Sequence, residues 1–250
     1  ATVDENGTVT ALRPIETVTI TAVYKTNPAL TCSWNLKITR TKGYITKQML
    51  DNLDLTAIKK VMITAHPDDE TLWGGGHLIE GEYLVVCMTH GWNPKRRTAF
   101  EQTMRTTNDK YLILDYPDVR KTFSNGKYET DMLSTCKNAM QEDINLILSY
   151  KKWDLIATHN PFGEYGKYLH KTISQMVTQC YNKMTNKSAT LYYFGRYYNS
   201  SNKIPGEQIA PELLAIKNSM VDRYYPTAKG AIVAFGHMIP YENWLLPSEW

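Results

Sequence analysis

The chain has 250 residues, with 28 basic and 25 acidic side chains and a formal net charge of +3. Hydrophobic residues make up 42% of the sequence, which is enough for a sizeable core. The sequence contains no run of eighteen apolar residues and no basic stripe, so it predicts neither a membrane span nor a nucleic-acid partner.

Residues 1–41 differ from the rest of the chain in their pattern of polar and apolar residues. Threonine alternates with apolar residues at 8–12 and 17–24, which is the period of a β-strand, and 30–38 is a candidate third strand. Gly7 follows three polar residues, a pattern typical of a turn with positive φ. We expect a separate β element with exposed strand edges.

The letters V-D-E-N-G-T-V-T-A-L and, further on, V-T-I-T-A resemble the C-terminal half of a bacterial immunoglobulin-like (Big-2) domain. The resemblance assigns residues 1–41 to a partial Big-2 domain and implies a bacterial protein with an extracellular or cell-surface location. The alternative interpretation is a β-rich extension that packs on the domain that follows.

From residue 42 onward, predicted strands alternate with predicted helices. The strands are expected at residues 60–64, 83–89, 111–114, 153–158 and 189–194, and the helices at 71–79, 97–108, 130–150 and 168–184. This alternation predicts an α/β fold of the Rossmann-like kind, with a mainly parallel sheet covered by helices on both faces. Ligands of such folds bind beyond the C-terminal ends of the strands. Polar segments follow three of the strands there, at 65–70, 89–91 and 158–161.

The first of these segments reads A-H-P-D-D-E and begins at Ala65. The segment holds a histidine and three carboxylates within five residues. The carboxylates repel one another and raise each other's pKa unless a cation neutralises their charge. His66 and Asp69 are three positions apart and can face one metal ion, which takes such ligands. Asp68 then points to a different side, where it is free to act on a water molecule. The segment predicts half of a zinc hydrolase site.

A strand followed by A-H-P-D-D-E resembles the PIG-L/LmbE-like deacetylases, which remove the N-acetyl group from N-acetylglucosamine-type sugars. The resemblance implies that residues 42–250 form a deacetylase domain with a sugar or glycoconjugate substrate. It also implies a bound zinc ion, with another divalent transition metal as the alternative. The implied reaction is amide hydrolysis, with Asp68 as the general base.

The second motif of the family is roughly G-x-Y-G-H-x-x-H, and its last histidine binds the metal. The match places that ligand at His170 and places Tyr165 near the substrate carbonyl. His159 lies closer to the preceding strand and is the other candidate, as a ligand or as a supporting residue. The chain departs from the family at Lys167, where the pattern has a histidine, and at Leu169, where many members have aspartate.

Two interpretations of Lys167 stay open at this point. A fixed positive charge can stabilise a developing oxyanion, so Lys167 joins Tyr165 and Asp68 as a candidate catalytic residue. It can equally be a solvated loop lysine. The departure from the family also leaves a second function open, a carbohydrate-binding surface module that keeps the metal but has weak or no catalysis. A third is a structural or adhesive surface protein in which the β-rich segment matters most.

Substrate-binding residues are expected at the start of the helix after the second strand. The family places an arginine there, and the match falls on Arg96, with Arg97 beside it. An arginine fork can bind sugar hydroxyls or phosphate, although a solvated helix face is the alternative for both residues. His237 is a candidate for the pocket or for a structural role.

The four cysteines are Cys32, Cys87, Cys136 and Cys180, and none belongs to a C-x-x-C pair. Cys87 lies in an apolar run and is expected as a buried thiol. Cys136 and Cys180 are separate thiols or a disulfide. The glycines at 74–76 lack the spacing of a phosphate loop, which favours close packing of a helix on the sheet.

Overall fold

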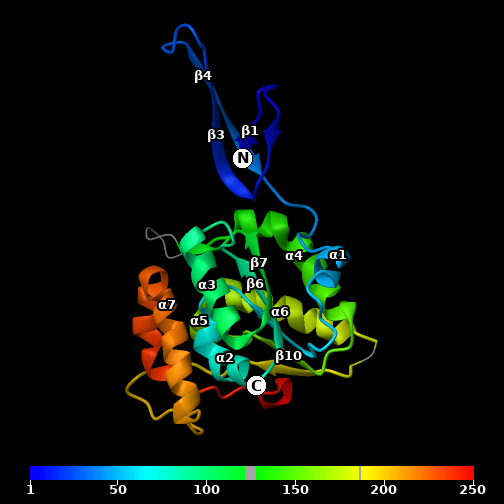
Figure 1. The fold of residues 1–250 in the computed structure, drawn as a ribbon, viewed down its shortest axis with the longest axis vertical. Coiled ribbons are helices and arrows are strands. Elements are labelled where there is room, and N and C mark those ends of the chain that lie inside the picture. Colours follow the sequence, from blue (N-terminus) through cyan, green and yellow to red (C-terminus); the bar gives the residue numbers. More distant parts are fainter. Residues whose placement is uncertain (122–127, 186) are drawn as a thin grey trace.

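The computed structural model describes residues 1–121, 128–185 and 187–250. A small β segment at the N-terminus precedes a larger α/β part (Figure 1). The elements of the N-terminal segment are β1 (Thr2–Val3), β2 (Val9–Thr10), β3 (Ile15–Val23) and β4 (Thr31–Ile38). The elements of the α/β part are α1 (Lys47–Asp51), β5 (Lys60–Thr64), α2 (Asp69–Glu80), β6 (Tyr83–Thr89), α3 (Pro94–Thr107), β7 (Lys110–Tyr116), β8 (Arg120–Lys121), β9 (Tyr128–Glu129), α4 (Asp131–Tyr150), β10 (Leu155–Thr158), α5 (Gly163–Gly166), α6 (Tyr168–Lys183), β11 (Thr190–Tyr193) and α7 (Pro211–Phe235).

The core of the α/β part is a parallel sheet of five strands in the order β11-β10-β5-β6-β7. All seven residues of β6 are buried, as are the last four of β5. Continuous apolar runs of this kind are typical of parallel strands that are covered on both sides. The predicted α/β fold with a mainly parallel sheet is therefore confirmed.

Alternate residues of β5 belong to two different hydrophobic clusters. Val61 and Ile63 pack in a cluster with side chains of α1, α4 and α6, whereas Met62 packs in a cluster with side chains of α2, α3 and α7. Since successive side chains of a strand point to opposite faces, helices cover both faces of the sheet. The carboxyl end of β5 is left open between these layers, and the A-H-P-D-D-E segment begins there.

Helix α2 packs closely on its neighbours because of its glycines. A Cβ atom at Gly74 would lie 2.7 Å from the Met62 side chain of β5, and one at Gly75 would lie 2.9 Å from Lys217 of α7. The expectation that these glycines serve close packing is confirmed. Helix α7 contains Pro226, and its backbone leaves helical geometry at Ala228.

The N-terminal β segment projects from the α/β part (Figure 1), and Arg13 of this segment contacts Trp92. Strands β3 and β4 form an antiparallel hairpin with Val18 opposite Leu36, and β1 pairs with β2. No third strand joins either pair in the described part of the chain. The hairpin exposes large side chains, including Trp34. In the described residues the expected β element consists of two separate strand pairs with open edges.

The chain is anchored where it enters the α/β part. The Asp143 carboxylate on α4 accepts the backbone N–H groups of Tyr44 and Ile45, each at 2.8 Å, and the hydroxyl of Tyr116 at 2.6 Å. A Cβ at Gly43 would collide with the same carboxylate, so a glycine is needed there. The backbone at residues 43–45 is thus held by carboxylates of α4.

All four cysteines are free thiols, and Cys87, Cys136 and Cys180 are buried. Cys136 and Cys180 are therefore separate. None of the described helices is both long and apolar enough to cross a membrane.

Candidate metal centre

The three ligands that the sequence analysis assigned to a metal lie together in a buried cluster. His66 Nδ1 is 3.1 Å from His170 Nε2 and 3.2 Å from Asp69 Oδ2, and the last two atoms are 3.4 Å apart. Tetrahedral zinc ligands at about 2.0–2.1 Å from the ion stand roughly 3.3–3.4 Å from one another. The cluster can therefore take up one ion with little movement of its side chains.

A carboxylate orients each ligand histidine through the nitrogen that points away from the cluster. His66 Nε2 donates to Asp118 Oδ1 at 3.0 Å, and His170 Nδ1 donates to Glu164 Oε2 at 2.5 Å. Carboxylates in this position fix the imidazole tautomer and increase its basicity as a ligand. The other nitrogen of each imidazole, Nδ1 of His66 and Nε2 of His170, faces Asp69.

The electrostatic environment of the cluster favours a cation. Burial alone would lower the pKa of His66, but the carboxylates of Asp118 and Asp69 raise it to about 9. Burial lowers the pKa of His170 to about 4, so this imidazole is a neutral donor with a lone pair. A positive charge, carried by a proton or by a metal ion, is therefore stabilised beside a neutral imidazole.

His159 lies behind the cluster. Its Nε2 accepts the Ala65 N–H at 2.9 Å, and its Nδ1 donates to Glu164 Oε2 at 3.0 Å. Its ring stacks on His170 with centroids 3.9 Å apart. His159, Glu164 and His170 also approach one another closely enough to hold an ion. However, the Nδ1 atoms of both imidazoles are hydrogen-bonded to Glu164 Oε2. The geometry favours His170 as the third ligand and His159 as a supporting residue.

Glu164 binds both imidazoles at once and is ionised. Burial alone would raise its pKa, but His159 and His170 lower it to about 2. Its second oxygen accepts the Asn160 N–H at 3.0 Å, and Asn160 Oδ1 in turn accepts the Glu164 N–H. The loop after β10 is thus closed around this carboxylate.

The two carboxylates beside Asp69 have different surroundings. Glu70 is fully buried and turns away from the cluster, accepting the hydroxyl of Tyr224 at 2.6 Å and that of Thr71 at 2.7 Å. Asp68 instead lines the cavity next to the cluster. Burial, followed by the charge of Asp69, raises the pKa of Asp68 to about 8. Asp68 is therefore positioned to exchange a proton near neutral pH.

A cavity of about 130 Å³ adjoins the cluster and brings together most of the predicted site residues. It is lined by His66, Asp68, Asp69, Leu72, Trp73, His90, Arg96, Asp118, Tyr165, Lys167, Ala231 and Phe235. Lys167 is half-buried and directly precedes α6, as the helix predicted from residue 168 requires. Tyr165 packs against Phe235 with ring centroids 4.4 Å apart.

Two of the candidates lie elsewhere. Arg97 forms an ion pair with Glu101 at 3.0 Å, is half exposed, and is not among the described residues that line the cavity. The interpretation as a solvated helix face fits Arg97, whereas Arg96 reaches the cavity. His237 Nε2 donates to the Tyr198 carbonyl at 2.8 Å, which fits a structural role.

Three loops at the site hold a non-glycine residue at positive φ. The φ angles are 135° at Asp68, 67° at His90 and 53° at Glu164. Such conformations cost about 1–3 kcal/mol each and persist where the surroundings over-determine them. At these positions Asp68 and His90 line the cavity, and Glu164 accepts from His170.

Sequence analysis did not identify Asp118, Glu164 or His90 as site residues. His90 lines the cavity, and its ring packs edge-on against His66 with centroids 5.7 Å apart. Burial, together with the charge of His66, lowers the pKa of His90 to about 4. Their position along the chain could have identified them, since all three follow the ends of strands, where the ligands of α/β folds bind.

No family model matches the chain. The mimivirus (Acanthamoeba polyphaga mimivirus) protein "Uncharacterized protein L374" is 31% identical over 175 residues, which make up 63% of this chain and 67% of the viral protein. Among solved structures, the conserved protein TT1542 from Thermus thermophilus has a TM-score of 0.51 at 13% identity, covering 77% of this chain and 96% of that one. The structural likeness shows a shared fold. The sequence identity shows more, and the chain belongs to the same family as the mimivirus protein L374.

Proposed function

We propose that this chain is a metal-dependent N-deacetylase of the PIG-L/LmbE-like kind, which removes the acetyl group from an N-acetylglucosamine-type sugar or glycoconjugate. One observation carries the proposal. The cluster of three candidate ligands adjoins a small cavity through His66 and Asp69, and the cavity also contains Asp68, a carboxylate without a place among the ligands. Hydrolysis of an amide needs this combination of a cation and a nearby base.

The proposed ion is zinc, held by His66, Asp69 and His170. Two imidazole nitrogens and one carboxylate oxygen are a donor set that zinc takes in catalytic sites. When bound, the ion supplies Lewis acidity, which polarises an amide carbonyl and makes a water molecule more acidic. Asp118 and Glu164 hold the two imidazoles in position.

Asp68 is the proposed general base. Its pKa of about 8 falls as positive charge enters the cluster, which brings it towards the neutral range where proton transfer is efficient. The carboxylate takes a proton from the attacking water. It then returns this proton to the amine that leaves with the sugar.

The other polar residues of the cavity act on the substrate. Tyr165 and Lys167 line the wall, where a hydroxyl and an ammonium group can stabilise the oxyanion that develops on the acetyl oxygen. Arg96 lines the same cavity and donates to the Thr227 carbonyl at 3.3 Å, which leaves other N–H groups for sugar hydroxyls.

Acetate release from N-acetylglucosamine substrates tests the proposal, measured together with the metal content. Asp68→Asn should keep the metal and lower turnover by roughly 10²–10⁴-fold, the usual share of general acid–base catalysis. Asparagine has nearly the same size and shape as aspartate, so the loop should keep its conformation. Asp222→Asn, on the exposed side of α7, is the matched control.

Unchanged turnover in Asp68→Asn would remove Asp68 from the mechanism. A wild-type protein that binds the metal but releases no acetate would favour the alternative of a carbohydrate-binding module.

A further inference from the structure

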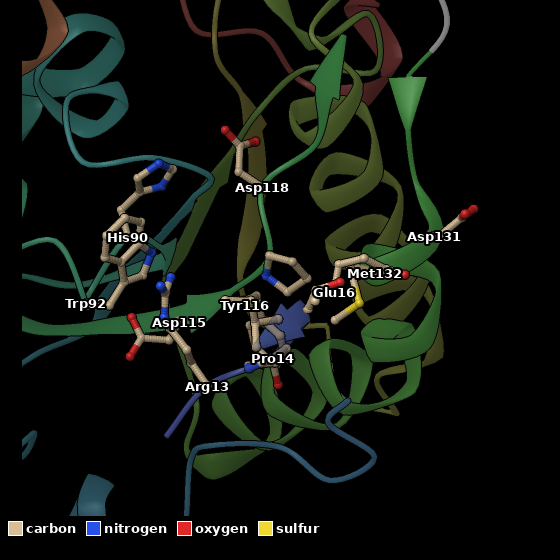
Figure 2. Close-up of a pocket in the computed structure, with 13 residues that line it drawn as sticks. Arg13, Pro14, Glu16, His90, Trp92, Asp115, Tyr116, Asp118, Asp131 and Met132 are labelled. Atoms are coloured by element: carbon tan, nitrogen blue, oxygen red, sulfur yellow. The ribbon is translucent and has the colours of Figure 1, made fainter. Parts of the chain in front are cut away.

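A second, larger cavity lies between the N-terminal β segment and the rim of the sheet (Figure 2). Its volume is about 590 Å³, against about 130 Å³ for the cavity at the candidate metal centre. Pockets that bury small-molecule ligands span roughly 300–1,000 Å³. The metal cavity is too small to bury more than part of one sugar unit, whereas the larger cavity has room for further units.

The two cavities are neighbours, since His90 and Asp118 line both. Asp118 Oδ1 accepts the hydrogen bond from His66, so this wall residue touches a ligand of the candidate metal. His90 Nδ1 lies 2.7 Å from the hydroxyl of Thr89, which donates its own hydrogen to Ala65. His90 therefore donates from Nδ1 and keeps an acceptor at Nε2. A chain lying in the larger cavity would meet this acceptor on its way to the metal centre.

The N-terminal segment supplies one wall of the larger cavity through residues 13–17. The guanidinium of Arg13 lies 3.9 Å from the ring centroid of Trp92, which follows β6 and is half exposed. In Figure 2, His90 and Trp92 lie on one side of the cavity, and Asp131 and Met132 lie on the other. The Trp92 ring thus holds the guanidinium over its face, and the N–H groups at the edge of a guanidinium fork can donate to the hydroxyl groups of a sugar.

The charged groups of this cavity indicate the kind of chain that it takes. Its lining contains the carboxylates Glu16, Asp115, Asp118 and Asp131, but Arg13 is the one guanidinium or ammonium group among its described lining residues. A phosphate in this cavity would face several carboxylates and would be repelled. Hydroxyl groups can donate to carboxylates and accept from Arg13, so a neutral, hydroxyl-rich ligand fits.

We propose that the larger cavity binds the sugar units next to the one that reacts, so that the protein acts on a neutral oligosaccharide chain. The N-terminal segment is then part of the substrate site, with Arg13 and Trp92 as specificity-determining residues. The inference rests on the proposed deacetylase function, and it names the substrate class of that site.

Calorimetric titration of the chelator-treated protein tests the inference without catalysis. The ligands are N-acetylglucosamine, its β-1,4-linked tetramer and N-acetylglucosamine 1-phosphate. The tetramer should bind at least tenfold more tightly than either monosaccharide. Trp92→Ala and Arg13→Ala should each remove most of this difference, whereas Trp34→Ala, which removes an exposed tryptophan of β4, should keep it. Arg13→Ala leaves the α/β part unaltered and covers the case in which Trp92→Ala fails to fold.

Equal affinities for monomer and tetramer, or tetramer binding that is insensitive to both variants, would overturn the inference. Tighter binding of the phosphorylated sugar would overturn its neutral-chain part. Acetate release from the same ligands by the zinc-loaded protein separates the two proposals. If the tetramer binds in a way that depends on Trp92 but no acetate is released, the proposed deacetylase function is wrong and the proposal that the larger cavity binds sugar units is supported.

Discussion

His66 donates from Nε2 to Asp118 Oδ1 over 3.0 Å, and this bond aims the other imidazole nitrogen at Asp69 and His170. Asp118 follows β7, an edge strand that carries none of the candidate ligands, whereas His66 follows β5 at the centre of the sheet. The orientation of the first ligand therefore depends on a strand two positions away in the sheet.

The first prediction concerns the third ligand. His170→Ala should weaken metal binding by more than the roughly 10–100-fold that changes in supporting residues cost. Metal content after dialysis, followed by elemental analysis, measures the effect. His237→Ala is the matched control, since this imidazole bonds to the Tyr198 carbonyl and lies outside the cluster. An unchanged metal stoichiometry in His170→Ala would show that the assignment is wrong.

Glu164→Gln tests the carboxylate that supports two imidazoles. The amide lacks the negative charge that both N–H groups face, and its own NH₂ group competes with them. We expect metal affinity to fall by about 10–100-fold. Competition with a chromogenic chelator gives the affinity, and Glu101→Gln, in a surface ion pair of α3, is the control. Equal affinities for the two variants would remove Glu164 from the metal site.

Lys167→Ala tests the departure from the PIG-L/LmbE-like pattern. If the ammonium group stabilises the oxyanion, turnover should fall by about 10²–10³-fold while metal affinity stays the same. Lys171→Ala, one turn further along α6 and exposed, is the matched control. Lys167→His should support activity, because it introduces the residue of the PIG-L/LmbE-like pattern. Wild-type turnover in Lys167→Ala would identify this lysine as a bystander.

The raised pKa of the buried Asp109 carboxyl predicts that the free energy of unfolding depends on pH. Burial raises its pKa to about 7, well above the value of about 3.9 in an unfolded chain. Between these values the folded state binds more protons, so the free energy of unfolding falls as the pH rises, by up to about 4 kcal/mol. Asp109→Asn should remove this loss, and its stability relative to wild type should grow from pH 4 to pH 7. Urea unfolding across this range measures the difference, and a difference that does not vary with pH would contradict the prediction.

Much of the fold could be predicted because its signals are local. The strands at 60–64 and 83–89 are short apolar runs with clear ends, and they occur at the predicted positions. The pairing of His66 with Asp69 is also local, since three positions separate them at the start of a helix. The order of the strands has no such signal, because alternation of strands and helices is compatible with several orders.

The supporting residues could not be predicted because they depend on backbone conformation and distant contacts. Glu164 reaches two imidazoles from a residue at φ 53°, a conformation that its side chain gives no reason to expect. Asp118 is 52 positions from the imidazole that it binds. Helix α7 lies outside the predicted elements, and Pro226 interrupts its pattern.

The break in α7 divides the helix into two parts with separate tasks. Before the break, Tyr224 is bonded to Glu70 and so to the segment that carries the ligands. After it, Ala231 and Phe235 form one wall of the metal cavity. A change in the bend angle would move Ala231 and Phe235 relative to the candidate ligands, whose positions would stay the same. Selection or design acting on residues 226–228 could therefore alter the shape of this cavity without changing any of the candidate ligands.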